Sequence, residues 1–160
     1  PEPKGFRAGG WFANMDVLKA VNDAGFEYDS SGRDSYTFGS QEQLGFWNLD
    51  YTQKPYHPSL IDQNEAGVSD RLRLLEVPNN GNDAYWHTSQ QLLDRFFINY
   101  EPGQVLDEPH MVTYMTHPDW FSTDKPRLRK LFKEIDKFAW QNDAGPVIYT
   151  TVSDTLSEWN

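Results

Sequence analysis

Hydrophobic side chains recur at helical spacing in two stretches of the first hundred residues. Asn14 is a candidate N-cap, and Gly25 stands where the first helix is expected to end. After Thr88, apolar residues again repeat every three or four positions and predict a second helix. The apolar positions of the two helices are Met15, Val17, Leu18, Val21 and Ala24, then Leu92, Leu93, Phe96, Phe97 and Tyr100.

The most regular helical pattern lies in the C-terminal third of the chain. It begins at Lys125-Pro126, where a proline suits the first turn, and is expected to end near Gly145. A short last helix is predicted with Ser153 as its cap. The apolar positions of the longer helix are Leu128, Leu131, Phe132, Ile135, Phe138 and Ala139.

Short apolar runs between these helices predict β-strands at residues 26–28, 72–77, 110–116 and 147–152. Strands that alternate with helices favour an α/β fold with parallel pairing. A chain of 160 residues is long enough for one domain with a single core, so we expect residues 1–160 to form a single domain.

Composition narrows the class of ligand. The net charge of −10 disfavours nucleic acids and membrane surfaces as partners, and no apolar run approaches the roughly 20 residues that span a bilayer. Aromatic residues make up 15% of the chain, which suits neutral ligands with flat apolar faces, such as sugars; an acidic surface also simply favours solubility. With no cysteine, the chain has no thiolate ligand or cysteine nucleophile.

His117 is the leading candidate for chemistry. It follows the predicted strand 110–116 and is followed by Asp119, an arrangement that suits general acid or base catalysis. A histidine that only hydrogen-bonds within a loop is an equally good interpretation. His110, at the other end of a continuous strand, would lie about 23 Å away at roughly 3.3 Å per residue, so the two could not share a metal. The sequence contains no close pair of metal ligands.

Four further residues are candidates for binding or positioning. Arg7 lies among glycines and can hold a carboxylate, although a lone arginine is more often part of a structural or surface ion pair. Asp29 ends a predicted strand and can bind substrate hydroxyls, but an Asp-Ser pair also commonly begins a turn. Trp11 and Trp120 can stack on sugar faces, although packing is the commoner role of a tryptophan.

Several segments together resemble the polysaccharide deacetylase (NodB-homology) family. Residues 6–11, Phe-Arg-Ala-Gly-Gly-Trp, are similar to the third motif of the family, and residues 25–31 resemble the Gly-Tyr-x-Tyr-Asp-Ser-Ser stretch that follows it. Residues 74–78 resemble the intervening strand. Residues 112–118 look like the last motif, a hydrophobic strand that ends in a histidine, and residues 147–159 resemble the closing strand and helix.

This resemblance implies an α/β fold that forms the C-terminal half of a distorted (β/α) barrel. It also implies metal-dependent removal of N-acetyl groups from an acetylated glycan by a secreted or cell-surface protein. A zinc-type ion held by one Asp and two His polarises the carbonyl and activates water, with a second Asp as base. On the matching positions, His117 is the general acid, Arg7 holds the base, and Trp11 and Asp29 shape the groove.

The first two motifs of the family, Thr-Phe-Asp-Asp and His-Ser-x-x-His, do not occur in this sequence. No residue of this chain is therefore assigned as a metal ligand. The ligands are expected from a complementary N-terminal half or a second chain, unless catalysis has been lost. The sequence opens with Pro1 rather than Met, and we expect a processed or excised segment. Two alternatives stay open: a non-catalytic carbohydrate-binding domain that uses the aromatic residues of 30–70 and 82–87, and a structural partner subunit.

Overall fold

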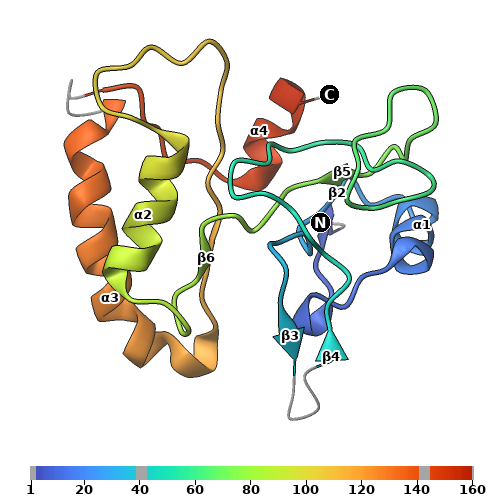
Figure 1. Ribbon diagram of the computed structural model, residues 1–160, viewed down its shortest axis with the longest axis horizontal. Coiled ribbons are helices and arrows are strands. Elements are labelled where there is room, and N and C mark those ends of the chain that lie inside the picture. The colour runs from blue at the N-terminus through green and yellow to red at the C-terminus, as the bar shows by residue number, and fades with distance from the viewer. Residues whose placement is uncertain (1–2, 39–42, 141–144, 160) are drawn as a thin grey trace. The chain divides into compact units, whose positions relative to one another are not determined.

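The computed structural model describes residues 3–38, 43–140 and 145–159 (Figure 1). The chain divides into two compact units, one made of Pro1–Asn80 and Thr151–Asn160 and the other of Gly81–Thr150. The described residues form small, mostly parallel sheets and four α-helices, which confirms the mixed α/β character; their strands do not close into a barrel. None of the described helices is long and apolar enough to cross a membrane.

A three-stranded parallel sheet organises the first unit. Its strands β1 (Gly5–Phe6), β2 (Tyr28–Asp29) and β5 (Leu75–Glu76) lie in the order β1-β2-β5, and the second residues of the three strands pair in register. These residues therefore share the carboxyl edge of the sheet, where parallel folds usually place functional side chains. An antiparallel pair, β3 (Thr37–Phe38) and β4 (Gln43–Leu44), and a 3₁₀ helix, η1 (Gly9–Trp11), complete the N-terminal part.

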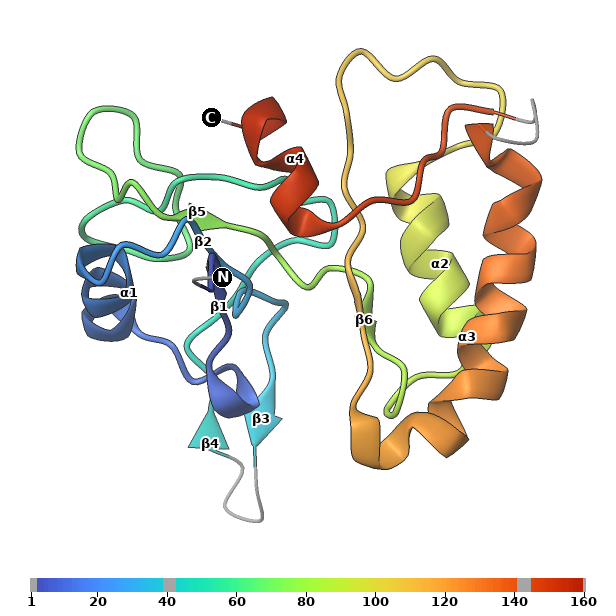
Figure 2. The same cartoon turned by 180° about the vertical axis from the view of Figure 1, so that it is seen from behind.

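The first predicted helix is confirmed as α1 (Met15–Asp23), together with both of its ends (Figure 2). The Asn14 side chain accepts a hydrogen bond from the Val17 N–H at 3.1 Å, which makes Asn14 the N-cap. Gly25 has a φ of +86°, a left-handed conformation that glycine adopts without strain just beyond a helix.

The last helix of the first unit, α4 (Val152–Trp159), begins before the predicted cap Ser153. The Thr151 hydroxyl accepts a hydrogen bond from the Asp154 N–H at 3.3 Å and donates one to the Asp154 carboxylate at 2.7 Å, so Thr151 caps the helix in place of Ser153.

The prediction of a strand at residues 147–152 was wrong. Its pairing is limited to one bridge between Val147 and Ala139, because β-branched residues form a strand only where a partner strand is available.

The second unit combines a short parallel pair with two longer helices. The strands are β6 (Asn82–Asp83) and β7 (Tyr114–Met115), and the helices are α2 (Ser89–Asn99) and α3 (Phe121–Ile135). The second predicted helix is thus confirmed as α2. Thr88 and Gln91 form a capping box at the start of α2. Each side chain accepts a hydrogen bond from the backbone N–H of the other residue.

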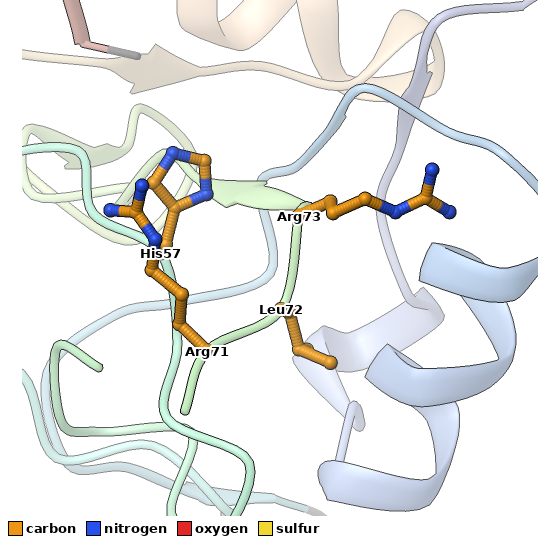
Figure 3. Close-up of a pocket in the computed structure, with 4 residues that line it drawn as sticks. All are labelled: His57, Arg71, Leu72 and Arg73. Atoms are coloured by element: carbon orange, nitrogen blue, oxygen red, sulfur yellow. The ribbon is translucent and has the colours of Figure 1, made fainter. Parts of the chain in front are cut away.

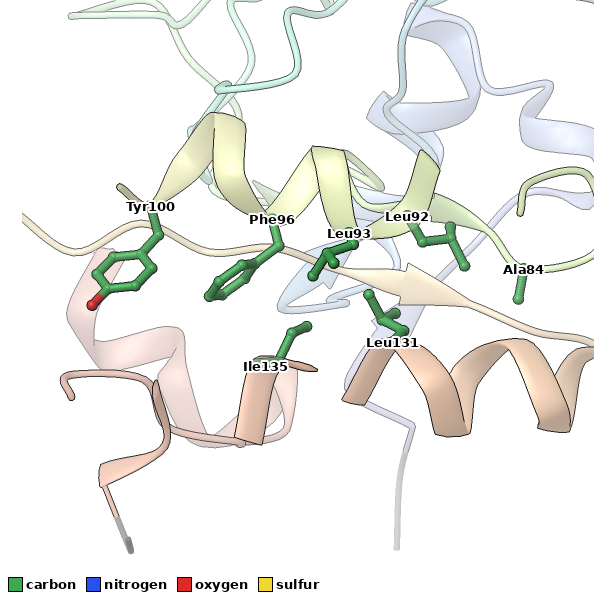
Figure 4. Packing of buried hydrophobic residues seen from close by; sticks show 7 residues of the cluster. All are labelled: Ala84, Leu92, Leu93, Phe96, Tyr100, Leu131 and Ile135. Atoms are coloured by element: carbon green, nitrogen blue, oxygen red, sulfur yellow. The ribbon is translucent and has the colours of Figure 1, made fainter. Parts of the chain in front are cut away.

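A cluster of buried apolar side chains joins α2 to α3 (Figure 4). Burying one large side chain of this kind stabilises a fold by about 1.5–3 kcal/mol. Phe97, predicted to share the buried face of α2, is 38% exposed because it points about 100° around the helix from Phe96. The buried residues of the cluster are Ala84, Leu92, Leu93, Phe96, Tyr100, Leu131 and Ile135.

The boundaries predicted for the third helix were wrong at both ends. A 3₁₀ helix, η2 (Pro118–Trp120), runs directly into α3, which therefore starts four residues before Lys125. At the other end the backbone tightens into η3 (Asp136–Phe138), well before Gly145.

The strands predicted at residues 72–77 and 110–116 are also shorter than expected, each being reduced to a two-residue strand. Pairing continues only as far as the partner strand does, and β6, the partner of β7, has two residues. The continuous strand used to separate His110 from His117 is therefore not formed.

Candidate functional site

Asp83 and His117 form a hydrogen-bonded pair in the second unit. The parallel register places Asp83 opposite Met115, so the chain beyond β7 brings His117 next to the Asp83 carboxylate. The His117 Nε2 lies 3.1 Å from the Asp83 Oδ2. The Asp83 side chain has no exposed surface, whereas the His117 side chain is 40% exposed. A buried carboxylate thus orients an imidazole that solvent or a ligand can reach.

The second nitrogen of the His117 ring is available for chemistry. Because the Nε2–H is donated to Asp83, the Nδ1 is the nitrogen that can bind and release a proton. Among the described residues, no side chain or backbone group hydrogen-bonds this Nδ1. The carboxylate is fixed in turn, since its Oδ1 accepts the Tyr85 N–H at 2.8 Å.

Three aromatic side chains, Tyr85, Trp86 and Trp120, form an aromatic cluster beside His117. Trp120 stacks on Tyr85 with ring centroids 4.1 Å apart, and its ring meets the His117 ring at 4.6 Å. Trp86 packs edge-on against Tyr85 and is 67% exposed. Of the three rings only Trp86 is exposed, and such a ring suits the apolar face of a sugar. Trp120 thus lies beside His117, the candidate acid, and its substrate-binding role stays a prediction.

Helix α3 holds the segments that carry the site. The Arg127 guanidinium donates to the carbonyl oxygens of Ala84 at 2.7 Å and Tyr85 at 2.6 Å. One turn earlier, the fully buried Asp124 accepts a hydrogen bond from the Thr116 hydroxyl at 2.7 Å. The stretches on either side of the Asp83–His117 pair are thus tied to one rigid helix, which favours a fixed geometry.

Sequence reasoning did not single out Asp83 as a candidate functional residue. Asp83 lies 34 positions before His117, and no local pattern connects the two. The one general rule that could have indicated Asp83 is that functional polar residues gather at the ends of neighbouring parallel strands.

The first unit places Arg7 and Asp29 around a serine-rich turn. Arg7 Nη2 donates to the Ser30 Oγ at 2.7 Å. Asp29 is fully buried and accepts two hydrogen bonds from Ser31, one from its N–H at 3.0 Å and one from its hydroxyl at 2.9 Å. This is the turn geometry named above as the alternative for Asp29. The roles of Arg7 and Asp29 in catalysis and substrate binding stay predictions.

A second carboxyl group, Glu76, is the register partner of Asp29 on the neighbouring strand and is also fully buried. Burial raises the pKa of Glu76 well above its usual range, and the charge of Asp29 raises it further, against a smaller opposing effect of Arg7. Burial also raises the pKa of Asp29, while the neighbouring Glu76 acts in the lowering direction. Glu76 Oε1 accepts the Gly32 N–H at 2.7 Å, and its buried Oε2 makes no hydrogen bond with a described residue. Burial beside Asp29 therefore favours the neutral, protonated form of Glu76.

Trp11 is packed inside the first unit. It is 8% exposed, with the Arg33 guanidinium 4.5 Å above its ring and Tyr36 against its edge. These contacts favour the packing interpretation over sugar stacking for this residue.

The described residues do not fit the zinc-type ion that the family resemblance implies. No three His, Asp or Glu side chains within 3–38, 43–140 and 145–159 are grouped so that they could hold a metal ion.

The chain matches no protein-family model, no curated protein and no solved structure. The case for a function therefore depends on the sequence motifs and on the geometry around His117.

Proposed function

We propose that this chain supplies the general-acid side of a glycan N-deacetylase site, as the C-terminal half of a distorted (β/α) barrel. The observation that carries the proposal is the Asp83–His117 pair beside the exposed aromatic cluster. A proton donor and a sugar-binding surface are the two parts of such a site that a single unit can provide. The order of the deacetylase-like motifs along the sequence supports the same interpretation.

The reaction needs a proton donor because an amine is a poor leaving group. When the tetrahedral intermediate collapses, the carbon–nitrogen bond breaks once the nitrogen has received a proton. His117 Nδ1 donates this proton, while Asp83 holds the ring through Nε2. Asp83 acts through His117 and is a positioning residue. The aromatic cluster holds the sugar so that its acetamido group faces the imidazole.

The remaining parts of the site belong to the segment that carries the first two family motifs. A zinc-type ion there would polarise the acetyl carbonyl and activate water. We propose that a complementary N-terminal half or a second chain supplies the ion and the base. By the resemblance, Arg7 orients that base, and the substrate is an acetylated glycan outside the cell.

Acetate release from an N-acetylated chitooligosaccharide tests this proposal. We expect no release by the chain alone with zinc or cobalt, because its described residues bring no three metal ligands together. We expect release that EDTA abolishes when a second chain carrying the first two motifs is added. If neither arrangement releases acetate although the glycan still binds, the deacetylase proposal is wrong.

A non-catalytic carbohydrate-binding domain is the second candidate. The 67% exposure of Trp86 within the aromatic cluster favours it, because a binding surface of this kind needs no proton donor. The two candidates differ in the role of His117. If the chain is a binding domain, its affinity for the sugar should be unchanged when the His117 imidazole is removed.

A further inference from the structure

A pocket in the first unit is lined by basic side chains and by no acidic one. It has a volume of about 380 Å³, and its lining residues are His57, Arg71, Leu72 and Arg73 (Figure 3). Two arginines and a histidine at one pocket stand out in a chain whose net charge is −10. Antiparallel bridges from Pro58 to Ala66 and from Ser59 to Arg71 fix the backbone around it.

His57 presents one unpaired nitrogen to this pocket. The residue is only 8% exposed, and its Nδ1 lies 3.2 Å from the Leu74 carbonyl oxygen, which makes Nδ1–H the donor to that carbonyl. The Nε2 has no hydrogen-bond partner among the described residues. The ring is thus largely buried and fixed through Nδ1, and its Nε2 is accessible to a polar ligand in the pocket.

The two arginines differ in how they are held. The Arg73 guanidinium lies 3.4 Å from the Asn22 carbonyl oxygen at the end of α1, and the Arg73 backbone N–H donates to the Asn22 side chain at 2.9 Å. The Arg71 guanidinium makes no ion pair or hydrogen bond with a described residue. Figure 3 shows the Arg71 guanidinium on the same side of the pocket as the His57 ring, with Arg73 extending to the opposite side.

We propose that this pocket binds the dianionic group of a phosphate monoester. Arg71 donates two hydrogen bonds to the phosphate oxygens, and His57 Nε2 hydrogen-bonds to a third oxygen. Arg73, whose guanidinium is turned towards the end of α1, adds positive charge at longer range. A phosphate monoester offers three terminal oxygens to these groups, whereas a carboxylate offers only two. The pocket is larger than inorganic phosphate, which leaves room for the organic part of the ester.

Calorimetric titration of the 160-residue chain with inorganic phosphate and with glycerol 3-phosphate tests the proposal. We expect both to bind, glycerol 3-phosphate more tightly, and acetate at least tenfold more weakly than either. Arg71→Ala is expected to weaken phosphate binding about tenfold or more, since it removes charge-assisted hydrogen bonds. Arg129→Ala, which removes an exposed arginine of α3 and the same charge, is the matched control and should leave the affinity unchanged.

The results of these titrations distinguish a specific phosphate site from non-specific attraction of the anion to positive charge. Absence of binding, or equal losses in Arg71→Ala and Arg129→Ala, would overturn the proposal. Arg71→Lys keeps the charge and loses the planar pair of donors, so it should weaken binding several-fold even if Arg71→Ala fails to fold. The ¹⁵N resonance of His57 Nε2 in the unsubstituted chain should shift on addition of phosphate. An unchanged resonance at saturation would also contradict the proposal.

Discussion

Replacing His117 with alanine is expected to lower the rate of acetate release by about 10²–10⁴-fold, the range that a general acid usually contributes. The rate is measured in the mixture with the chain that carries the first two motifs. The dissociation constant for the chitooligosaccharide should change by less than about threefold, because the imidazole acts on the leaving nitrogen rather than on the sugar ring. A loss confined to turnover identifies His117 as a proton donor.

His110→Ala provides the matched control, since it removes an imidazole from the same unit outside the Asp83–His117 pair. We expect it to leave turnover unchanged. Asp83→Asn should lower turnover and shift its pH profile while retaining glycan binding, because the amide cannot stabilise the charged ring as a carboxylate does. If His117→Ala turns over at the normal rate, the imidazole is not the acid and the proposed mechanism fails.

Glu76→Gln is expected to abolish much of the dependence of folding stability on pH. In the folded chain the pKa of Glu76 is raised, whereas in the unfolded chain it is about 4.3. Between these two values the folded chain binds the extra proton. The contribution of Glu76 to the free energy of unfolding is therefore greatest below pH 4 and falls as the pH rises towards its folded-state pKa, by up to about 1.4 kcal/mol per pH unit. Glutamine stays neutral at every pH, and its Oε1 can accept the Gly32 N–H as Glu76 does, so the variant should stay stable at the higher pH.

Urea unfolding at intervals from pH 5 to pH 8 measures this difference. The stabilities of the unsubstituted chain and the variant should be similar at the lower pH and diverge steadily above it, with the variant the more stable. Glu65→Gln, a change at an exposed position of the same unit, should leave the slope unchanged. Parallel curves for the unsubstituted chain and Glu76→Gln would show that Glu76 does not hold the proton in the folded state.

The helices could be predicted from the sequence because their signals are local. Asn14, Gly25 and Thr88 each act on backbone groups within a few residues of themselves, and all three mark the ends of helices in the structure. The end of α3 was predicted wrongly for a related reason. Apolar spacing continues through Phe138 and Ala139, although the backbone has already tightened into η3.

The two buried carboxylate pairings could not be read from the sequence. Asp29 meets Glu76 because β2 and β5 place them in register. Asp83 meets His117 because β6 pairs with β7, which ends two residues before His117. Residue type predicted that His117 would be reactive, but nothing in the sequence indicated which carboxylate lies behind it. Which tryptophans are exposed is likewise decided by tertiary packing, since Trp47 is 2% exposed and Trp86 is 67% exposed.

The affinity of the chain for a chitooligosaccharide, compared between Trp86→Ala and Trp140→Ala, tests most directly whether sugar binds beside His117. The two tryptophans are matched, since both lie in the second unit and are 67% and 66% exposed. We predict that Trp86→Ala weakens binding about 5- to 10-fold, corresponding to about 1–1.4 kcal/mol of aromatic stacking, and that Trp140→Ala has no effect. Equal affinities of the two variants, or a loss on replacing Trp140 alone, would contradict the placement of the sugar at the aromatic cluster.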